Sequence, residues 1–305
     1  MILSGAVYLF KTNKVESIVS QSSSSPTTID QIAAEITVKI LATEAIGSGT
    51  IWDSQDSNYI VVTNKHVLRV ESPPYHIQTS DGQIHHARVL SNSQLDDYDI
   101  AVLRFRAVHN SYQTAIPGDF LALNVGESVF AAGFPYDLDN ENLDIERSPN
   151  ELSKLALKTG RVSIVLDKAL EEGYQIGYTN DVKKGMSGGP LLNIQGEVVG
   201  INGKHAYPLW DQPDLFEDGS QPCFPLQKLI TRSSLAIPFK TIIQIAPPSI
   251  FLSNYDDDKL RFKKHQQPVV VNSKQNNNIE KLIYHMQAEA RFSKSCREFS
   301  PDLGL

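Results

Sequence analysis

The fold of this 305-residue chain is constrained most by a long succession of short β-rich runs. Between about residues 36 and 240, runs rich in Val, Ile, Tyr and Phe recur, and turn residues such as Asp81-Gly82 separate them. Runs so short and so closely spaced favour antiparallel pairing over parallel β-α-β units. Eighteen glycines and sixteen prolines also favour strands and turns over long helices. The pattern therefore predicts an all-β architecture.

The runs fall into two groups that a connector around residues 107–124 separates. The first group, over residues 36–112, predicts a six-stranded barrel with strands near residues 36–41, 49–52, 59–63, 75–79, 84–90 and 100–105. The second group, over residues 124–237, predicts strands near residues 129–134, 155–166, 174–178, 190–193 and 198–202, with Leu235-Ala236-Ile237-Pro238 after them. Short helices are expected before residue 36, with Thr28 or Asp30 near the cap, and over Phe239–Ile245.

One glycine-rich loop carries the strongest chemical signal. Glycines allow a loop to turn tightly and to direct backbone N–H groups into a cavity. A serine within such a loop is a poor nucleophile unless a histidine lies close enough to take its proton. The loop is Gly185-Met186-Ser187-Gly188-Gly189-Pro190, which makes Ser187 the candidate nucleophile.

His66 and Asp99 are the candidate partners of Ser187. His66 closes a β-branched and aromatic run that reads as a strand ending in a short loop, and a rigid strand end is a good mount for a catalytic base. Asp99 directly precedes Ile100-Ala101-Val102-Leu103, which is apolar enough to be a buried strand. Asp96 and Asp97 are rival carboxylates that read as a solvated acidic turn, so we prefer Asp99.

The order of these residues resembles that of trypsin-like serine peptidases of the chymotrypsin fold, and in particular the bacterial HtrA/Deg-like branch. The resemblance spans about residues 36–240 and implies two six-stranded antiparallel β-barrels with short flanking helices. It implies a serine endopeptidase that needs no cofactor, with Ser187 as nucleophile, His66 as general base and acid, and Asp99 orienting the imidazole. The Gly185 and Ser187 amides would form the oxyanion hole. Four motifs carry it: Gly47-Ser48-Gly49-Thr50-Ile51, Thr63-Asn64-Lys65-His66, Asp99-Ile100-Ala101-Val102-Leu103 and Gly185-Met186-Ser187-Gly188-Gly189-Pro190.

Met186 departs from the pattern of peptidases that are activated by removal of a pro-segment. In those enzymes this position is an aspartate that pairs with the newly freed N-terminal amine, and methionine cannot form that ion pair. No Ile-Val-Gly-Gly type terminus precedes the first expected strand either. We therefore expect an enzyme that is competent without N-terminal trimming.

Substrate-binding residues are expected at two places. Asp181 lies six positions before Ser187, where the trypsin branch has the base of its primary specificity pocket, and a buried carboxylate there would select Arg or Lys. Alternatively, Asp181 belongs to a polar surface turn and pairs with Lys183 or Lys184. Substrate backbone is expected to add as a strand beside the edge near Gly200–Gly203, with Gly200, Ile201 and Asn202 as its binding residues.

Composition excludes several other functions. A formal net charge of −7 argues against a nucleic-acid partner. No metal is expected, because His85 and His86 are neighbours on one strand and point to opposite faces. The two cysteines, Cys223 and Cys296, rule out a multi-disulfide framework, with a single bridge left open.

The regions outside the barrels complete the expected organisation. We expect a flexible segment over residues 1–27, a peptidase domain over 28–246 and an extension over 247–305 that does not resemble a PDZ domain. The insertion over residues 206–229 reads either as a lid or exosite or as an inert loop, and the amphipathic stretch 279–292 either binds a partner protein or packs on the second barrel. No membrane span is expected; a cytoplasmic location is favoured, and export remains open if the start clips a signal peptide.

Two functions compete with peptide hydrolysis. A non-catalytic relative would bind extended peptides in the same crevice as an adaptor, and loss of a triad member would identify it; none is lost here. An esterase of the α/β-hydrolase type would need parallel β-α units around its Gly-x-Ser-x-Gly turn, which the β-rich flanks do not supply.

Overall fold

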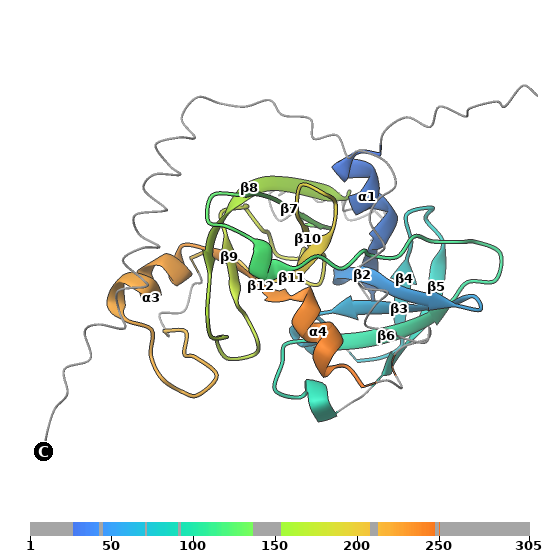
Figure 1. Ribbon diagram of the computed structural model, residues 1–305. Coiled ribbons are helices and arrows are strands. Elements are labelled where there is room, and N and C mark those ends of the chain that lie inside the picture. Colours follow the sequence, from blue (N-terminus) through green and yellow to red (C-terminus); the bar gives the residue numbers. More distant parts are fainter. Residues whose placement is uncertain are drawn as a thin grey trace, which may run out of the picture.

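The protein forms two closed antiparallel β-barrels (Figure 1). The computed structural model describes residues 27–42, 45–70, 72–90, 93–136, 154–207, 213–247 and 250. In the first barrel the strand order is β1-β2-β3-β6-β5-β4, so that the barrel closes through the pairing of β1 with β4. Its strands are β1 (Thr37–Leu41), β2 (Ala45–Gln55), β3 (Asn58–Thr63), β4 (Tyr75–Gln78), β5 (Ile84–Leu90) and β6 (Ala101–Arg106).

The second barrel repeats this order as β10-β11-β12-β9-β8-β7 and closes through β7 and β10. Its strands are β7 (Ser128–Gly133), β8 (Ala156–Val165), β9 (Ile176–Tyr178), β10 (Pro190–Leu192), β11 (Val198–Lys204) and β12 (Ser234–Pro238). The expectation of two six-stranded antiparallel barrels is confirmed.

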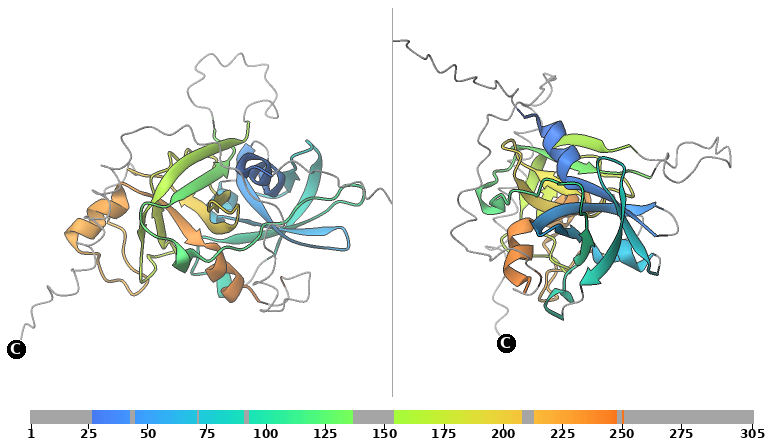
Figure 2. Two further views of the ribbon diagram at one scale, coloured as in Figure 1. Left: turned by 45° about the horizontal axis from the view of Figure 1, so that its top comes forward. Right: turned by 90° about the vertical axis from the view of Figure 1, so that its right-hand side faces the viewer.

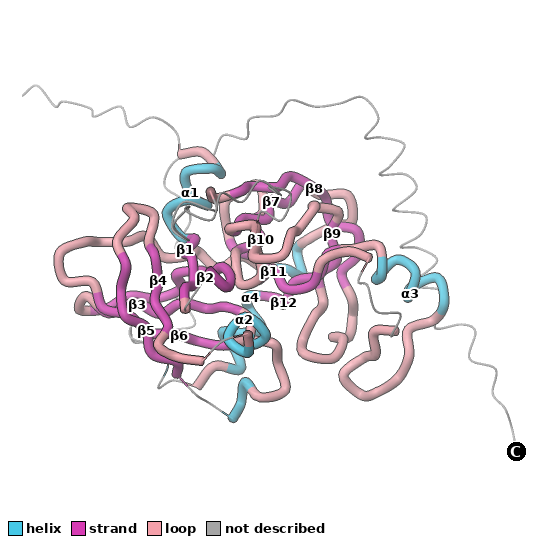
Figure 3. The backbone as a smooth tube through the Cα atoms, turned by 180° about the vertical axis from the view of Figure 1, so that it is seen from behind, coloured by secondary structure: helices cyan, strands magenta, loops and turns pink. Residues whose placement is uncertain are grey.

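Helices are short and lie around the barrels (Figure 3). They are α1 (Ile29–Ile36), α2 (Lys65–Arg69), α3 (Phe224–Thr231) and α4 (Phe239–Ile245), with 3-10 turns η1 (Ser93–Leu95) and η2 (Phe120–Ala122). Helix α1 begins with a capping box in which Thr28 and Gln31 bond each other's backbone N–H groups, as expected for a cap at Thr28. It lies over the junction of the two barrels (Figure 2).

Three apolar clusters explain why several strands are apolar without alternation. Tyr59 and Val61 of β3 point into the first barrel, whereas Ile60 and Val62 point outward into a layer between the barrels. The interior of the second barrel forms a third cluster. Because successive side chains of a strand face opposite ways, a strand covered on both faces is apolar throughout. The layer between the barrels holds the two halves of the crevice together.

Several expected boundaries differ from the structure. Helix α1 continues to Ile36, so the first strand begins at Thr37. The run after Asn64 is helix α2 and not a loop. Helix α3 begins within the insertion, directly after Cys223, and continues past it to Thr231; Cys223 is disulfide-bonded. The N-terminal segment over residues 1–26 and the amphipathic stretch over 279–292 lie outside the described residues.

Candidate active site

Asp99 is anchored by both its side chain and its backbone. It lies two positions before β6 and is only 2% exposed. Its Oδ2 lies 2.6 Å from Nδ1 of His66 and accepts a 2.5 Å hydrogen bond from the Tyr174 hydroxyl, while its Oδ1 accepts one of 2.8 Å from the His66 backbone N–H. The Asp99 carbonyl accepts from the Asn64 amide, and the Asp99 N–H donates to the carbonyl of Glu172. These contacts leave the carboxylate a single orientation.

The contacts of Asp99 also set its charge. Burial alone would raise the pKa of this carboxyl, but the hydrogen bonds and charge of His66, together with the Tyr174 hydroxyl, outweigh burial and lower the pKa below its ordinary value. Asp99 is therefore ionised at neutral pH and only accepts hydrogen bonds.

His66 lies in the first turn of α2 and presents its imidazole to the crevice, with a side chain that is 41% exposed. The Asp99 carboxylate accepts a hydrogen bond from Nδ1 of His66. The neutral imidazole therefore carries its proton on Nδ1 and keeps a lone pair on Nε2. The sequence predicted a strand end as the mount for this residue. The short helix α2 holds His66 in place equally well, because the His66 backbone N–H is bonded to Asp99 Oδ1.

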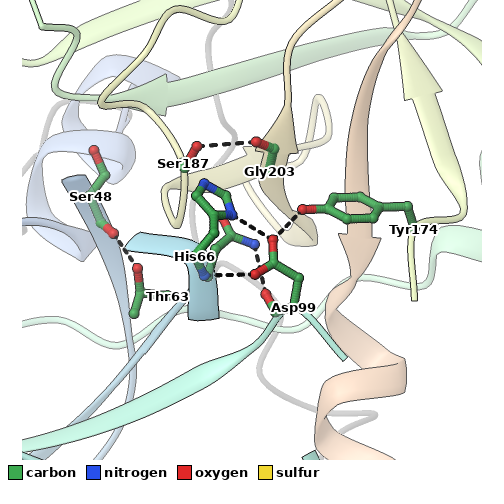
Figure 4. Close-up of polar contacts among 8 residues, drawn as sticks. Ser48, Thr63, His66, Asp99, Tyr174, Ser187 and Gly203 are labelled. Atoms are coloured by element: carbon green, nitrogen blue, oxygen red, sulfur yellow. Dashed lines mark hydrogen bonds and ion pairs between the residues drawn. The ribbon is translucent and has the colours of Figure 1, made fainter. Parts of the chain in front are cut away.

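Ser187 lies on the loop before β10 and belongs to the same group of contacts. Its hydroxyl donates to the carbonyl of Gly203 over 3.1 Å, and its own carbonyl accepts from the Ser48 N–H over 3.0 Å. A Cβ on Gly203 would overlap the Tyr174 hydroxyl that bonds Asp99, so the backbone beside Ser187 lies against the partner of the carboxylate. Figure 4 shows the bond from Ser187 to Gly203 beside the bonds of His66 and Tyr174 to Asp99. The structure thus brings Ser187, His66 and Asp99 side by side where the two barrels meet (Figure 4).

Backbone amides of the Ser187 loop are available to a ligand. Among the described residues, neither the Gly185 N–H nor the Ser187 N–H donates a hydrogen bond, whereas the Met186 N–H donates to Lys183. Gly185 has φ of +93°, a conformation that favours glycine. The loop therefore offers two unpaired donors on either side of Met186.

The orientation of these two amides is set by the carbonyls that precede them. The Lys184 carbonyl accepts from the Tyr136 N–H over 2.7 Å, and the Met186 carbonyl accepts from the Gly189 N–H over 3.1 Å. A trans peptide directs its C=O and N–H to opposite sides. The bond to the Lys184 carbonyl therefore directs the Gly185 N–H away from Tyr136. The bond to the Met186 carbonyl directs the Ser187 N–H away from Gly189 in the same way.

Met186 is fully buried in the apolar cluster inside the second barrel, where Val182 is also buried. The backbone of Met186 packs so closely on Gly133 that a Cβ there would lie 2.7 Å from the Met186 Cα. This methionine therefore anchors the loop by apolar packing. In peptidases activated by removal of a pro-segment, an ion pair of an aspartate with the new N-terminus holds this position instead.

A family model for the trypsin-like peptidase domain matches residues 47–201, slightly more than half of the chain. The matched span runs from β2 into β11 and includes His66, Asp99 and Ser187. The chain belongs to the trypsin-like peptidase domain family. The resemblance inferred from the four motifs is thereby confirmed.

Relatives of this trypsin-like peptidase domain carry Deg and Do-like names. A probable periplasmic serine endoprotease DegP-like of Buchnera aphidicola is 31% identical over 161 residues, covering 52% of this chain and 30% of the relative. Protease Do-like 1, chloroplastic, of Arabidopsis thaliana is 35% identical over 158 residues, covering 51% and 32%. Each match thus covers about half of this chain and less than a third of the relative. The crystal structure of Deg5 aligns with a TM-score of 0.49 and 22% identity, covering 71% of this chain and 89% of that one.

In this trypsin-like peptidase domain Asp181 lies at the surface. Its side chain is 69% exposed, and its Oδ2 lies 3.5 Å from Nζ of Lys183. The expected buried carboxylate at the base of a specificity pocket is therefore wrong, and the surface ion pair is correct. An offset counted along the chain did not locate a pocket wall because the loop before Ser187 turns this side chain outward.

Gly200, Ile201 and Asn202 do not form an open edge. Gly200 and Ile201 pair with β10 on one side and with β12 on the other. Asn202 is fully buried; its backbone bonds the Gly188 N–H and the Gly189 carbonyl, and its amide donates within the second barrel. A closed barrel has no free backbone at these positions. Pairing with β10 ends at Ile201, so the open edge begins at Gly203.

Two contacts of the site had not been foreseen from the sequence. Ser48 was recognised only as part of a motif, yet its hydroxyl bonds the Ser187 loop. Tyr174 was read as the first residue of a strand, yet it precedes β9 and bonds Asp99. A buried tyrosine hydroxyl that bonds a carboxylate 75 positions away along the chain has no local sequence signal.

Other classes of site are not apparent in the described part of the chain. Across residues 27–247, with the gaps stated above, no three His, Cys, Asp or Glu side chains are grouped to hold a metal ion. No helix in those ranges is long and apolar enough to span a bilayer.

Proposed function

We propose that this chain is a serine endopeptidase that hydrolyses peptide bonds through Ser187, His66 and Asp99. Ser187 Oγ attacks the substrate carbonyl while Nε2 of His66 takes its proton, giving a tetrahedral oxyanion. The imidazolium then protonates the leaving amine, the C–N bond breaks, and an acyl-enzyme remains. Water, deprotonated by His66, attacks the ester and releases the acid and the free serine.

The observation that carries this proposal is the 2.6 Å contact between Nδ1 of His66 and the buried carboxylate of Asp99. This contact leaves Nε2 as the basic nitrogen and stabilises the positive charge that develops on the ring. The serine hydroxyl lies in the same crevice, bonded to the Gly203 carbonyl, from which it must turn toward Nε2 before it attacks.

The Gly185 and Ser187 amides supply the second requirement, stabilisation of the oxyanion. Both are unpaired among the described residues, and both follow carbonyls that are held in place. Because Met186 anchors the loop by burial, we propose that this chain is active without N-terminal processing. An active-site phosphonate should label Ser187 in the uncut chain, and labelling only after removal of the segment before Ile36 would contradict this.

The substrates that fit this site are proteins or peptides in extended conformation. We propose that substrate backbone pairs with the edge that begins at Gly203, the last residue of the edge expected from the sequence. The peptidase unit is assigned to residues 28–246, with its crevice between barrels at about 36–112 and 124–237. We also propose that residues 247–305 bind a partner protein.

The test compares turnover of casein and of fluorogenic peptides by the natural chain and by Ser187→Ala. Loss of the nucleophile should lower kcat by about 10⁶-fold, while peptide binding persists. Ser163→Ala, which changes a buried serine of β8 that is bonded to Ser233, is the matched control and should keep its turnover. Equal turnover by the natural chain and Ser187→Ala would sink the peptidase assignment.

The alternative function is a silent peptide-binding adaptor. The feature in its favour is that the Ser187 hydroxyl is bonded to the Gly203 carbonyl in the structure. An adaptor would bind the same peptides with equal affinity in both forms and would turn over none of them.

A further inference from the structure

Tyr174 places its hydroxyl 2.5 Å from Oδ2 of Asp99, the same oxygen that faces Nδ1 of His66. We infer that Tyr174 is a positioning residue, which holds the Asp99 carboxylate in the orientation that His66 needs. The inference rests on the proposed peptidase function. It assigns a part in the reaction to a side chain from the second barrel.

Tyr174 is built into the site on all sides. Its side chain is fully buried, so that its hydroxyl needs a partner, and the partner is Asp99. The backbone opposite is Gly203, where a Cβ would overlap the hydroxyl and the ring of Tyr174. Glycine at this position is therefore required for the tyrosine to reach the carboxylate.

The turn that carries Tyr174 is also fixed to Asp99. The Asp99 N–H donates to the carbonyl of Glu172 over 3.0 Å, and the Leu170 N–H donates to the Tyr174 carbonyl over 2.8 Å. This turn joins β8 to β9 in the second barrel, whereas Asp99 belongs to the first. The two barrels are thus joined at the carboxylate itself, through the backbone and through the phenol.

The ring of Tyr174 is covered by a cation. Nζ of Lys204 lies 4.7 Å from the ring centroid and 3.0 Å from Oδ1 of Asp214, which belongs to the insertion over residues 206–229. A cation over the ring face is attracted to the phenol and keeps the ring in place. The insertion is thereby connected to Asp99 through Asp214, Lys204 and Tyr174.

The protonation state of Tyr174 suits a donor. Burial, followed by the negative charge and the hydrogen bond of Asp99, raises the pKa of this phenol well above its ordinary value. The hydroxyl therefore keeps its proton at neutral pH and donates a hydrogen bond to the carboxylate.

The test is Tyr174→Phe, which removes the hydroxyl and keeps the ring. We expect kcat for peptide hydrolysis to fall by about 10-fold with KM within about 2-fold, because a loosely held catalytic group affects the transition state and not substrate binding. The matched control is Tyr178→Phe. Tyr178 is equally buried and loses a hydrogen bond to Asn202, but it has no contact with Asp99. It should lose similar stability and keep kcat.

A second readout does not depend on activity. The Tyr174 hydroxyl lowers the pKa of Asp99, so in Tyr174→Phe that pKa should rise, and stability should be lost at a higher pH on acidification. Tyr178→Phe should unfold in acid as the natural chain does. Gly203→Ala, which displaces the hydroxyl, should reproduce the acid-unfolding shift of Tyr174→Phe.

The outcomes separate the two proposals. If the natural chain and Ser187→Ala do not differ in turnover, the peptidase proposal fails, and the acid-unfolding shift alone decides whether Tyr174 holds Asp99. If the natural chain hydrolyses peptides and folded Tyr174→Phe keeps its kcat and its acid-unfolding profile, the role of Tyr174 is refuted while the peptidase proposal stands.

Discussion

The Ser48 hydroxyl donates a 2.7 Å hydrogen bond to the carbonyl of Gly185, and so ties the first barrel to the loop that carries Ser187. The same hydroxyl accepts from the Phe134 N–H over 2.8 Å. Ser48 is fully buried on β2, so this contact is shielded from water. The orientation of the proposed oxyanion hole thus depends on a residue outside the barrel that contains it.

Ser48→Ala is expected to lower kcat by about 10-fold, less than the 100-fold or more that follows loss of a whole oxyanion donor. The substitution leaves two buried backbone groups without their partner and should also lower the free energy of unfolding by about 1–3 kcal/mol. Ser163→Ala breaks the buried pair with Ser233 and should show the stability loss alone. Steady-state kinetics and urea unfolding measure both effects; unchanged kcat in Ser48→Ala would contradict the role.

Gly185→Ala should lower kcat by at least about 100-fold, because the alanine Cβ would lie 2.5 Å from the Phe134 carbonyl oxygen and the loop must move. The control is Gly82→Ala. Gly82 also has a positive φ, of +80°, but has no atom within 4 Å of its added Cβ. Gly82→Ala should lower the free energy of unfolding by about 1–2 kcal/mol through backbone strain and leave turnover unchanged. Equal kinetics in the two variants would mean that the Gly185 amide is not an oxyanion donor.

Met186→Asp is expected to destabilise the protein by about 3–5 kcal/mol, because it places an uncompensated charge inside the second barrel. Met186→Leu preserves volume and should change stability by less than about 1.5 kcal/mol. Thermal unfolding and phosphonate labelling of both variants are the measurements. Full labelling of a stable Met186→Asp protein would show that apolar packing does not hold the loop.

Acid should destabilise the protein through Asp99. Because the pKa of Asp99 is lowered on folding, its contribution to stability is present above its unfolded pKa of about 3.9 and is lost as pH falls through the folded value. The difference in unfolding free energy between the natural chain and Asp99→Asn should therefore shrink below about pH 4. A difference that stays constant from neutral pH into acid would be the contrary result.

Asp181→Asn should change the preference between peptides with Arg and Val before the scissile bond by less than about 3-fold. The carboxylate is exposed and paired with Lys183, and exposed ion pairs contribute little. A peptide panel that varies only this position measures the preference. A 10-fold or larger loss for Arg alone would restore Asp181 to the specificity pocket.

Much of the fold could be predicted from local pattern. Strands such as Ile84–Leu90 were located at their observed boundaries, and the pairing of neighbours followed from short turns. His66, Asp99 and Ser187 were found because each stands in a short motif whose order along the chain is specific. Boundaries failed where tertiary packing extended an element, as in β2, which runs over Ala45–Gln55.

Local patterns a few residues long were sufficient to predict the class of fold and the three residues that meet where the barrels join. Packing over long sequence distances sets which backbone groups are free and which side chains touch across the barrels, and this could be seen only in the folded chain. Closure of the second barrel occupied Gly200 and Ile201, and the docking of one barrel on the other placed Tyr174 against Asp99. Tyr174 and Asp99 are 75 positions apart, and local periodicity does not predict which residues so far apart in the sequence will touch.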